Sequence, residues 1–210
     1  MIRSPQLLEA PMTTTLSPLL ERLTGDALDP LANQLDADRS TTRNAVAVAL
    51  PMILNGLARN ASAPEGASSL RRALERDHDG ALLDDAEGFL RSPDLEDGNG
   101  ILGHVFGDRR AAVERGVAKA SGLDIGKVGQ LLAMVAPLVL GALGRQQRER
   151  GLDEGGLRDL LDGERRAAED AVPGLGGLGA LLDRDSDGQI TDDLANLGKS
   201  LLGGLLGDKR

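Results

Sequence analysis

Two apolar segments that each contain an internal proline constrain the fold of this chain most strongly. They lie at residues 45–57 and 131–143, and residues 50–60 (LPMILNGLARN) align without a gap with residues 136–146 (APLVLGALGRQ). Apolar runs rich in Leu and Ala are typical of buried helices. A proline inside a helix removes one hydrogen bond and costs about 3 kcal/mol unless the helix bends. We therefore expect two long core helices with kinks at Pro51 and Pro137.

Other segments match in the same order along the chain, which indicates two copies of one helical unit. The matched pairs are residues 70–74 with 157–161, 75–85 with 183–193, and 101–109 with 201–209. The first of these pairs predicts an amphipathic helix after each proline-containing helix. The spacing between the last two blocks differs, because the first copy carries the polar stretch 91–100, which we interpret as an exposed loop.

These matches predict three parts of the chain. They are an N-terminal segment with a short helix (residues 1–28), a first helical unit (29–110) and a second helical unit with a glycine-rich C-terminal segment (111–210). A connecting helix is expected at residues 109–121. Because a helical sequence opens at Met12 and residues 1–11 show no helical period, we expect translation to begin at Met12.

The residues available for the core favour an all-α fold. Among 210 residues there are two Phe, no Trp and no Tyr, so Leu, Ala, Val, Ile and Met must fill the interior. Strands usually draw on β-branched and aromatic residues, whereas Leu, Ala and Met favour helices. The fold class expected is therefore a helical bundle of two related units, with proline-kinked core helices and short Asp-Gly turns.

Charge and cysteine content exclude several classes of function and location. The formal net charge of −9 opposes attraction to phosphate backbones, so no nucleic-acid partner is expected. The absence of cysteine excludes disulfides, thiolate zinc sites and cysteine nucleophiles. No apolar run approaches the roughly 20 residues needed to cross a bilayer, and no secretory signal opens the chain. We expect a cytoplasmic protein without a transmembrane segment.

The second acidic turn has the spacing of a calcium-binding loop over its first part. Carboxylates stand at positions 1, 3 and 5, a glycine at 6, a backbone carbonyl at 7 and a threonine at 9. Position 12, where a bidentate Glu is expected, is Leu194, so the neighbouring carboxylate would have to replace it. The predicted calcium ligands are Asp183, Asp185, Asp187, Gln189, Thr191 and Asp193.

The first acidic turn is a weaker candidate for calcium, with a similar layout and Ala86 at position 12. Its predicted ligands are Glu75, Asp77, Asp79, Ala81 and Asp85. The alternative for both turns is an Asp-Gly turn between helices, in which a side-chain oxygen caps the next helix and no metal binds. The sequence leaves both interpretations open, and no cofactor is expected unless one of these turns binds calcium.

No catalytic constellation is evident in the sequence. The only histidines, His78 and His104, are far apart along the chain, and no serine lies in a nucleophile-elbow pattern. Adjacent carboxylates such as Asp84 and Asp85 do not face each other on a helix. We therefore expect no enzymatic activity and interpret His104 as an ordinary helix residue.

Two motifs of the first unit resemble a known family. The acidic turn at residues 77–85 and the block GILGHVFG at residues 100–107, together with the proline-containing helix, are similar to the bacterial domain of unknown function 937 (DUF937). The resemblance covers residues 16–110 well and the second unit more loosely, because Gly204 and Leu206 replace His104 and Phe106. It implies a small helical bacterial protein and brings no established activity.

These observations predict a structural or interaction module that is not an enzyme. Its glycine-rich, aromatic-poor helix faces are suited to self-association as a homo-oligomer or to docking onto a helical protein partner. The alternative is a low-affinity calcium-binding module, in which one or both acidic turns become ordered when the cation binds.

Overall fold

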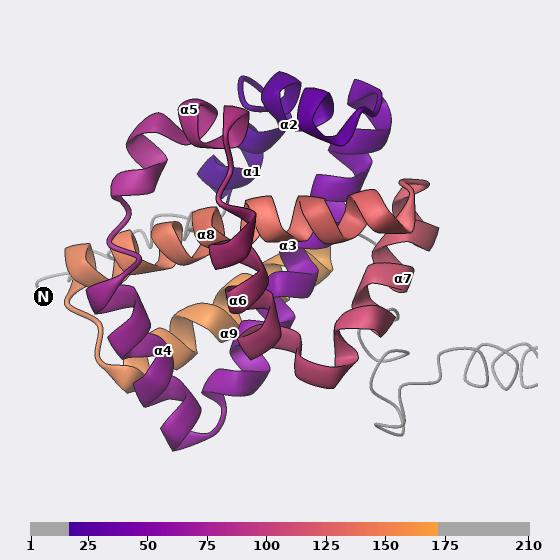
Figure 1. The fold of residues 1–210 in the computed structure, drawn as a ribbon. Helices are drawn as coiled ribbons and strands as arrows, with labels where there is room; N and C mark the ends of the chain where they lie inside the picture. The colour runs from indigo at the N-terminus through magenta and orange to yellow at the C-terminus, as the bar shows by residue number, and fades with distance from the viewer. Residues whose placement is uncertain (1–16, 172–210) are drawn as a thin grey trace, which may run out of the picture.

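The computed structural model describes residues 17–171, and in this part of the chain all regular structure is helical (Figure 1). The prediction of an all-α fold is confirmed. The helices are α1 (Ser17–Thr24), α2 (Leu28–Leu35), α3 (Arg39–Ala61), α4 (Pro64–Arg76), α5 (Ala86–Arg91), α6 (Leu95–Phe106), α7 (Arg110–Ser121), α8 (Ile125–Arg150) and α9 (Glu154–Ala171), with short 3₁₀ helices η1 (Ala81–Asp85) and η2 (Gly107–Arg109).

The two proline-containing segments form the two longest helices, α3 and α8, as predicted. Each begins at an aspartate cap: Asp38 accepts hydrogen bonds from the backbone N–H groups of residues 40 and 41, and Asp124 accepts one from Gly126. Both helices continue through their prolines, and the kinks at Pro51 and Pro137 stay a prediction. Residues 131–144 of α8 are all buried, so this helix is the centre of the core.

The helices of the two predicted units contact each other reciprocally. Helix α4 packs against α8, and α9 packs against α3 in return. Likewise α2 packs against α3 and α8, whereas α7 packs against α8 and α3. All these helices contribute to one continuous aliphatic core. In the described residues, helices from both predicted units therefore pack together around α3 and α8; the division into units at 29–110 and 111–210 stays a prediction.

The polar stretch 91–100 is the clearest error of the sequence interpretation. It was expected to be an exposed loop, but α6 begins at Leu95. The side chain of Asp94 accepts hydrogen bonds from the N–H groups of Glu96 (3.0 Å) and Asp97 (3.1 Å), which starts the helix. The glycine that suggested a loop, Gly98, instead lets α6 approach α8 closely. The predicted connecting helix is confirmed as α7.

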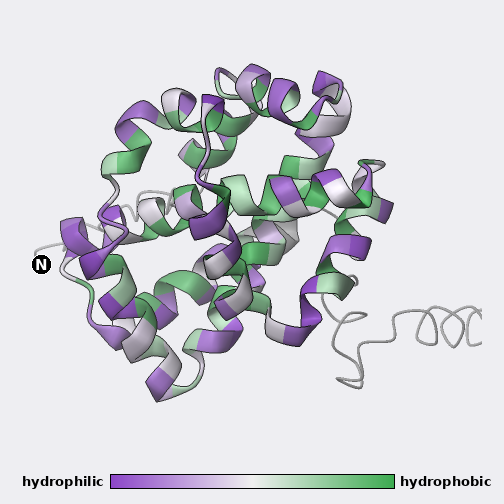
Figure 2. Ribbon diagram, in the orientation of Figure 1, coloured by the Kyte–Doolittle hydropathy of each residue, from purple (hydrophilic) through white to green (hydrophobic). Residues whose placement is uncertain are grey.

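Helix α8 is the one described helix that is long and apolar enough to span a membrane by length and composition. Of its most apolar window, 72% is buried inside the protein, which is what the central helix of a globular core requires. Figure 2 shows hydrophilic and hydrophobic residues alternating around the peripheral helices, as in amphipathic helices that cover such a core. The apolar character of α8 is thus accounted for by packing.

Candidate functional site

A cleft of about 770 Å³ opens between the C-terminal end of α3, helix α4, the turn that follows α4, and helix α6. Its floor consists of aliphatic side chains, and its rim carries charged and polar ones. The floor residues are Leu57, Leu70, Ile101, Val105 and Leu140; the rim residues include Arg59, Asn60, Arg76, Asp77, His78, Asp97 and His104.

The C-terminal end of α3 positions both walls of this cleft. The Nδ2 atom of Asn60 donates hydrogen bonds to the backbone carbonyls of His104 (2.8 Å) and Val105 (3.1 Å), which are among the last carbonyls of α6. On the other wall, a Cβ added to Gly66 of α4 would lie 1.9 Å from the Asn60 carbonyl oxygen. Only glycine permits α4 to start so close to α3, so the width of the cleft follows from these contacts.

Helix α8 holds the turn that closes one end of the cleft. Gly80 has φ +89°, a conformation that favours glycine. The Nη2 atom of Arg145 donates to the Gly80 carbonyl (2.5 Å) and to Oδ1 of Asp84 (2.6 Å). A Cβ added to Gly144 would lie 1.9 Å from the His78 carbonyl oxygen. The backbone at His78 therefore lies directly against α8.

The structure brings the two histidines to one cleft, although they are separated in sequence. His78 is half-buried and also lines a second, smaller cavity of about 300 Å³ together with Asp97, Pro137 and Gly141. Burial lowers the pKa of His78, and the negative charges of Asp97 and Asp77 oppose that shift. The buried environment therefore favours the neutral imidazole. His104 is exposed on α6, seven residues and about two turns after Asp97, on the same helix face.

The carboxylates among the predicted calcium ligands of the first acidic turn each make another contact. Asp77 pairs with the guanidinium of Arg76, which lowers the pKa of this aspartate. Oδ1 of Asp79 accepts from the N–H of Ala81 (2.9 Å), and Oδ1 of Asp85 accepts from the N–H of Gly88 (2.9 Å) at the start of α5. This is the arrangement of a turn whose side chains cap the following helices.

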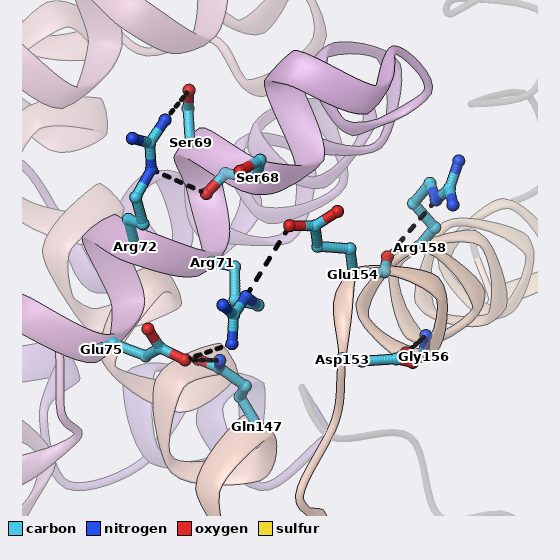
Figure 3. Close-up of polar contacts among 10 residues, drawn as sticks. All are labelled: Ser68, Ser69, Arg71, Arg72, Glu75, Gln147, Asp153, Glu154, Gly156 and Arg158. Carbon is cyan, nitrogen blue, oxygen red and sulfur yellow. Dashed lines mark hydrogen bonds and ion pairs between the residues drawn. The ribbon is translucent and has the colours of Figure 1, made fainter.

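The remaining predicted ligand, Glu75, belongs to a polar network that joins three helices (Figure 3). Its Oε1 accepts from Nη1 of Arg71 (2.7 Å) and from Nε2 of Gln147 on α8 (3.3 Å). Nε of Arg71 lies 3.9 Å from Oε1 of Glu154 on α9. The contacts are partly exposed, so each contributes little free energy, but together they fix α4 relative to α8 and α9.

Within residues 17–171, no group of three or more histidine or acidic side chains is arranged to hold a metal ion. Calcium binding at Glu75, Asp77, Asp79, Ala81 and Asp85 stays a prediction, without a converging set of ligands in this part of the chain. The stronger candidate, Asp183, Asp185, Asp187, Gln189, Thr191 and Asp193, lies outside the described residues.

The sequence interpretation missed the convergence of His78, Asp97 and His104. Two signals in the sequence could have indicated it. Asp97, Ile101 and His104 have the spacing of one face of a helix, which places polar groups beside an apolar floor residue. Gly98 interrupts an otherwise apolar packing surface and marks a close helix contact. Both signals required reading residues 95–100 as helix.

The comparison with protein families found a family model that matches this chain. The model of the family described as bacterial proteins of unknown function (DUF937) matches residues 18–146, from α1 to the last turns of α8. This range includes both proline-containing helices, the acidic turn and every residue that lines the cleft. No curated protein and no solved structure matches the chain. The family match covers more than half of the sequence, and the chain belongs to the DUF937 family of bacterial proteins of unknown function.

Proposed function

We propose that this protein is a non-catalytic interaction module whose cleft between α4 and α6 binds a short apolar helix of a partner protein. The observation that carries the proposal is the cleft itself, with an aliphatic floor and a polar rim. A concave apolar surface with a few polar groups at its edge is the usual form of a binding site in proteins. The proposal includes no chemical step.

The floor of the cleft provides the affinity. Leu57 and Val105 are buried and Leu70 is half-buried, so an inserted side chain meets rigid aliphatic surface on both sides. Burying one leucine-sized side chain contributes about 1.5–3 kcal/mol. Two such side chains, one turn apart on a partner helix, would account for most of the affinity of a weak and specific complex.

The rim of the cleft provides the specificity. It carries guanidinium groups at Arg59 and Arg76 and carboxylates at Asp77 and Asp97, so charges of both signs face an incoming segment. Complementary charges around an apolar centre select the orientation of a bound helix more than they strengthen its binding. The neutral imidazole of His78 can both donate and accept a hydrogen bond there.

Helix α6 leaves room for the partner. A Cβ added at Gly100, which lines the cleft, would have no heavy atom within 4 Å, and the same holds at Gly103 outside the cleft lining. An approaching helix can therefore come close to the backbone of α6 at Gly100. The pair also provides a variant and a matched control on one helix.

The experiment compares wild-type protein with Gly100→Trp and Gly103→Trp in co-purification from bacterial lysate, followed by identification of the bound proteins. Both substitutions place an indole on α6, but only the first fills the cleft. A specific partner retained by wild-type protein and Gly103→Trp, and lost with Gly100→Trp, would support the proposal. Equal recovery with both variants would contradict it, and circular dichroism checks that both fold.

A further inference from the structure

A second surface, on α3, is half-exposed where its counterpart on α8 is fully covered. In the alignment of the two proline-containing helices, Ala47 corresponds to Ala133 and Pro51 corresponds to Pro137. Ala133 is 1% exposed, and α8 is buried throughout this region. The outward face of α3, by contrast, consists of half-buried side chains at helical spacing, which are Ala47, Val48, Pro51, Asn55 and Ala58.

The helix that covers this region of α8 is α6. A Cβ added to Gly98 would lie 2.0 Å from the Ala133 carbonyl oxygen, so the two backbones are in direct contact. Four apolar side chains of α6 are buried; they are Ile101, Leu102, Val105 and Phe106. The last two lie beside Gly56 of α3, so α6 packs with one glycine against α8 and with part of its apolar face against α3.

The same register occurs once more in the chain, at residues 195–206. The block that aligns residues 101–109 with 201–209 extends upstream without a gap, and Gly198 then falls at the position of Gly98. The four apolar positions are occupied by Leu201, Leu202, Leu205 and Leu206. A helix with this sequence would present the same flat glycine contact and the same apolar face as α6.

One change in size is compensated across the contact. Phe106 of α6 packs on Gly56 of α3, where an added Cβ would lie 2.9 Å from the phenylalanine ring. In the second copy, Leu206 replaces the phenylalanine and Ala142 replaces the glycine. If the two positions were in contact in the second copy as well, a smaller side chain would face a larger one, and the packed volume would stay nearly constant.

We infer that residues 195–206 form a helix that docks on the outward face of α3 of the same chain, as α6 docks on α8. Helix α9, the last described helix, packs against α3, the helix that residues 195–206 would cover. Residues 172–194 connect the two, and an extended chain covers up to about 3.3 Å per residue, which is ample. This inference concerns a different face from the cleft and does not depend on the proposed function.

The docking would not extend to the second acidic turn. On α8, the carbonyl of His78 rests on Gly144, where there is no room for a side chain. The corresponding residue of α3 is Ala58, whose methyl group occupies that space. Helix α3 therefore offers no counterpart of the glycine contact at Gly144, and the inference is confined to residues 195–206.

The test is hydrogen exchange measured by mass spectrometry on the full chain, with light scattering to determine its mass. Three variants are compared with wild type: Gly198→Leu and Ala47→Glu, which disturb the two sides of the contact, and Gly203→Leu. The last is the control, because its counterpart Gly103 has open space around it. Exchange of residues 17–171 in the same samples shows that the rest of the protein remains folded.

The expected result is a monomer in which the amides of residues 195–206 exchange at least on the order of 100-fold more slowly than in an unstructured chain. This protection should be lost in Gly198→Leu and Ala47→Glu and retained in Gly203→Leu. Fast exchange of 195–206 in wild type would overturn the inference. So would protection that neither Gly198→Leu nor Ala47→Glu removes, or protection present only in a dimer, which would place the segment on a second copy.

Discussion

Replacing Gly98 by alanine tests one of the closest helix contacts in the described part of the fold. The new methyl carbon would lie 2.0 Å from the Ala133 carbonyl oxygen, whereas an ordinary contact needs about 3.5 Å. Helix α6 must therefore move away from α8 by about 1.5 Å. Because the obstacle is backbone, no rotamer change relieves it, and we expect the strain to cost about 2–3 kcal/mol, in the upper part of the range for overpacking. Against this cost, alanine stabilises the helix by about 1 kcal/mol relative to glycine, because its intrinsic helix propensity is higher.

We therefore expect Gly98→Ala to lower the free energy of unfolding by about 1–2 kcal/mol after the propensity gain. The control is Gly103→Ala on the same helix, where an added Cβ has no heavy atom within 4 Å. There the propensity gain of up to about 1 kcal/mol is uncompensated, so this variant should be more stable than wild type. The two variants should thus differ by about 2–3 kcal/mol in opposite directions from wild type.

The assay is urea unfolding followed by far-ultraviolet circular dichroism, because the chain has no Trp or Tyr to report by fluorescence. A gap of this size corresponds to about 5–10 °C in Tm for a protein of this length. Equal stability of the two variants would refute the close approach of α6 to α8. A stabilised Gly98→Ala would refute it as well.

Three further predictions concern a histidine, a helix cap and a metal site. Burial lowers the pKa of His78, so its contribution to stability is present above about pH 6.5 and is lost as the pH falls through the folded-state pKa. Wild type should therefore lose more stability than His78→Gln between about pH 7.5 and 5.5, which urea unfolding midpoints at the two pH values would measure. Asp124→Ala should cost about 1 kcal/mol in the same assay, because it removes the cap of α8, whereas Asp124→Asn should stay close to wild type. If the second acidic turn binds calcium, calorimetric titration of wild type should give a heat signal at millimolar or tighter affinity. The double substitution Asp185→Ala plus Asp187→Ala should abolish this signal, and the absence of a signal in wild type would contradict the calcium prediction.

The long helices could be predicted because their sequence signals are local and agree with each other. In α3 and α8, apolar runs, an aspartate just before the first turn and good helix formers all favour the same state. A proline inside each segment could have been interpreted as the end of a helix. Because the proline occurs at the same position in two aligned apolar segments, a position inside a helix was the better interpretation in both. The amphipathic α4 likewise begins with Pro64 in its first turn, where proline is tolerated.

Helix α6 and the cleft could not be predicted in the same way, because they depend on contacts between distant segments. Gly98 and Gly100 favour a loop by local propensity, and only the approach to Ala133 on α8 shows why a glycine is useful at the first of them. Similarly, Asn60 caps α6 from 44 residues away in sequence. Because these contacts cannot be derived from the sequence, the sequence did not predict that His78 and His104 line the same cleft.

The most direct test of a binding role for the cleft is site-specific photo-crosslinking in bacterial cells. The residue p-benzoylphenylalanine is introduced in place of Ala73, which lines the cleft, or in place of its neighbour Arg72, which is exposed outside it. A discrete crosslinked protein at position 73, and none at position 72, is the result predicted. The same products at both positions, or none at position 73 in a protein that folds normally, would contradict the assignment of this cleft as the binding site.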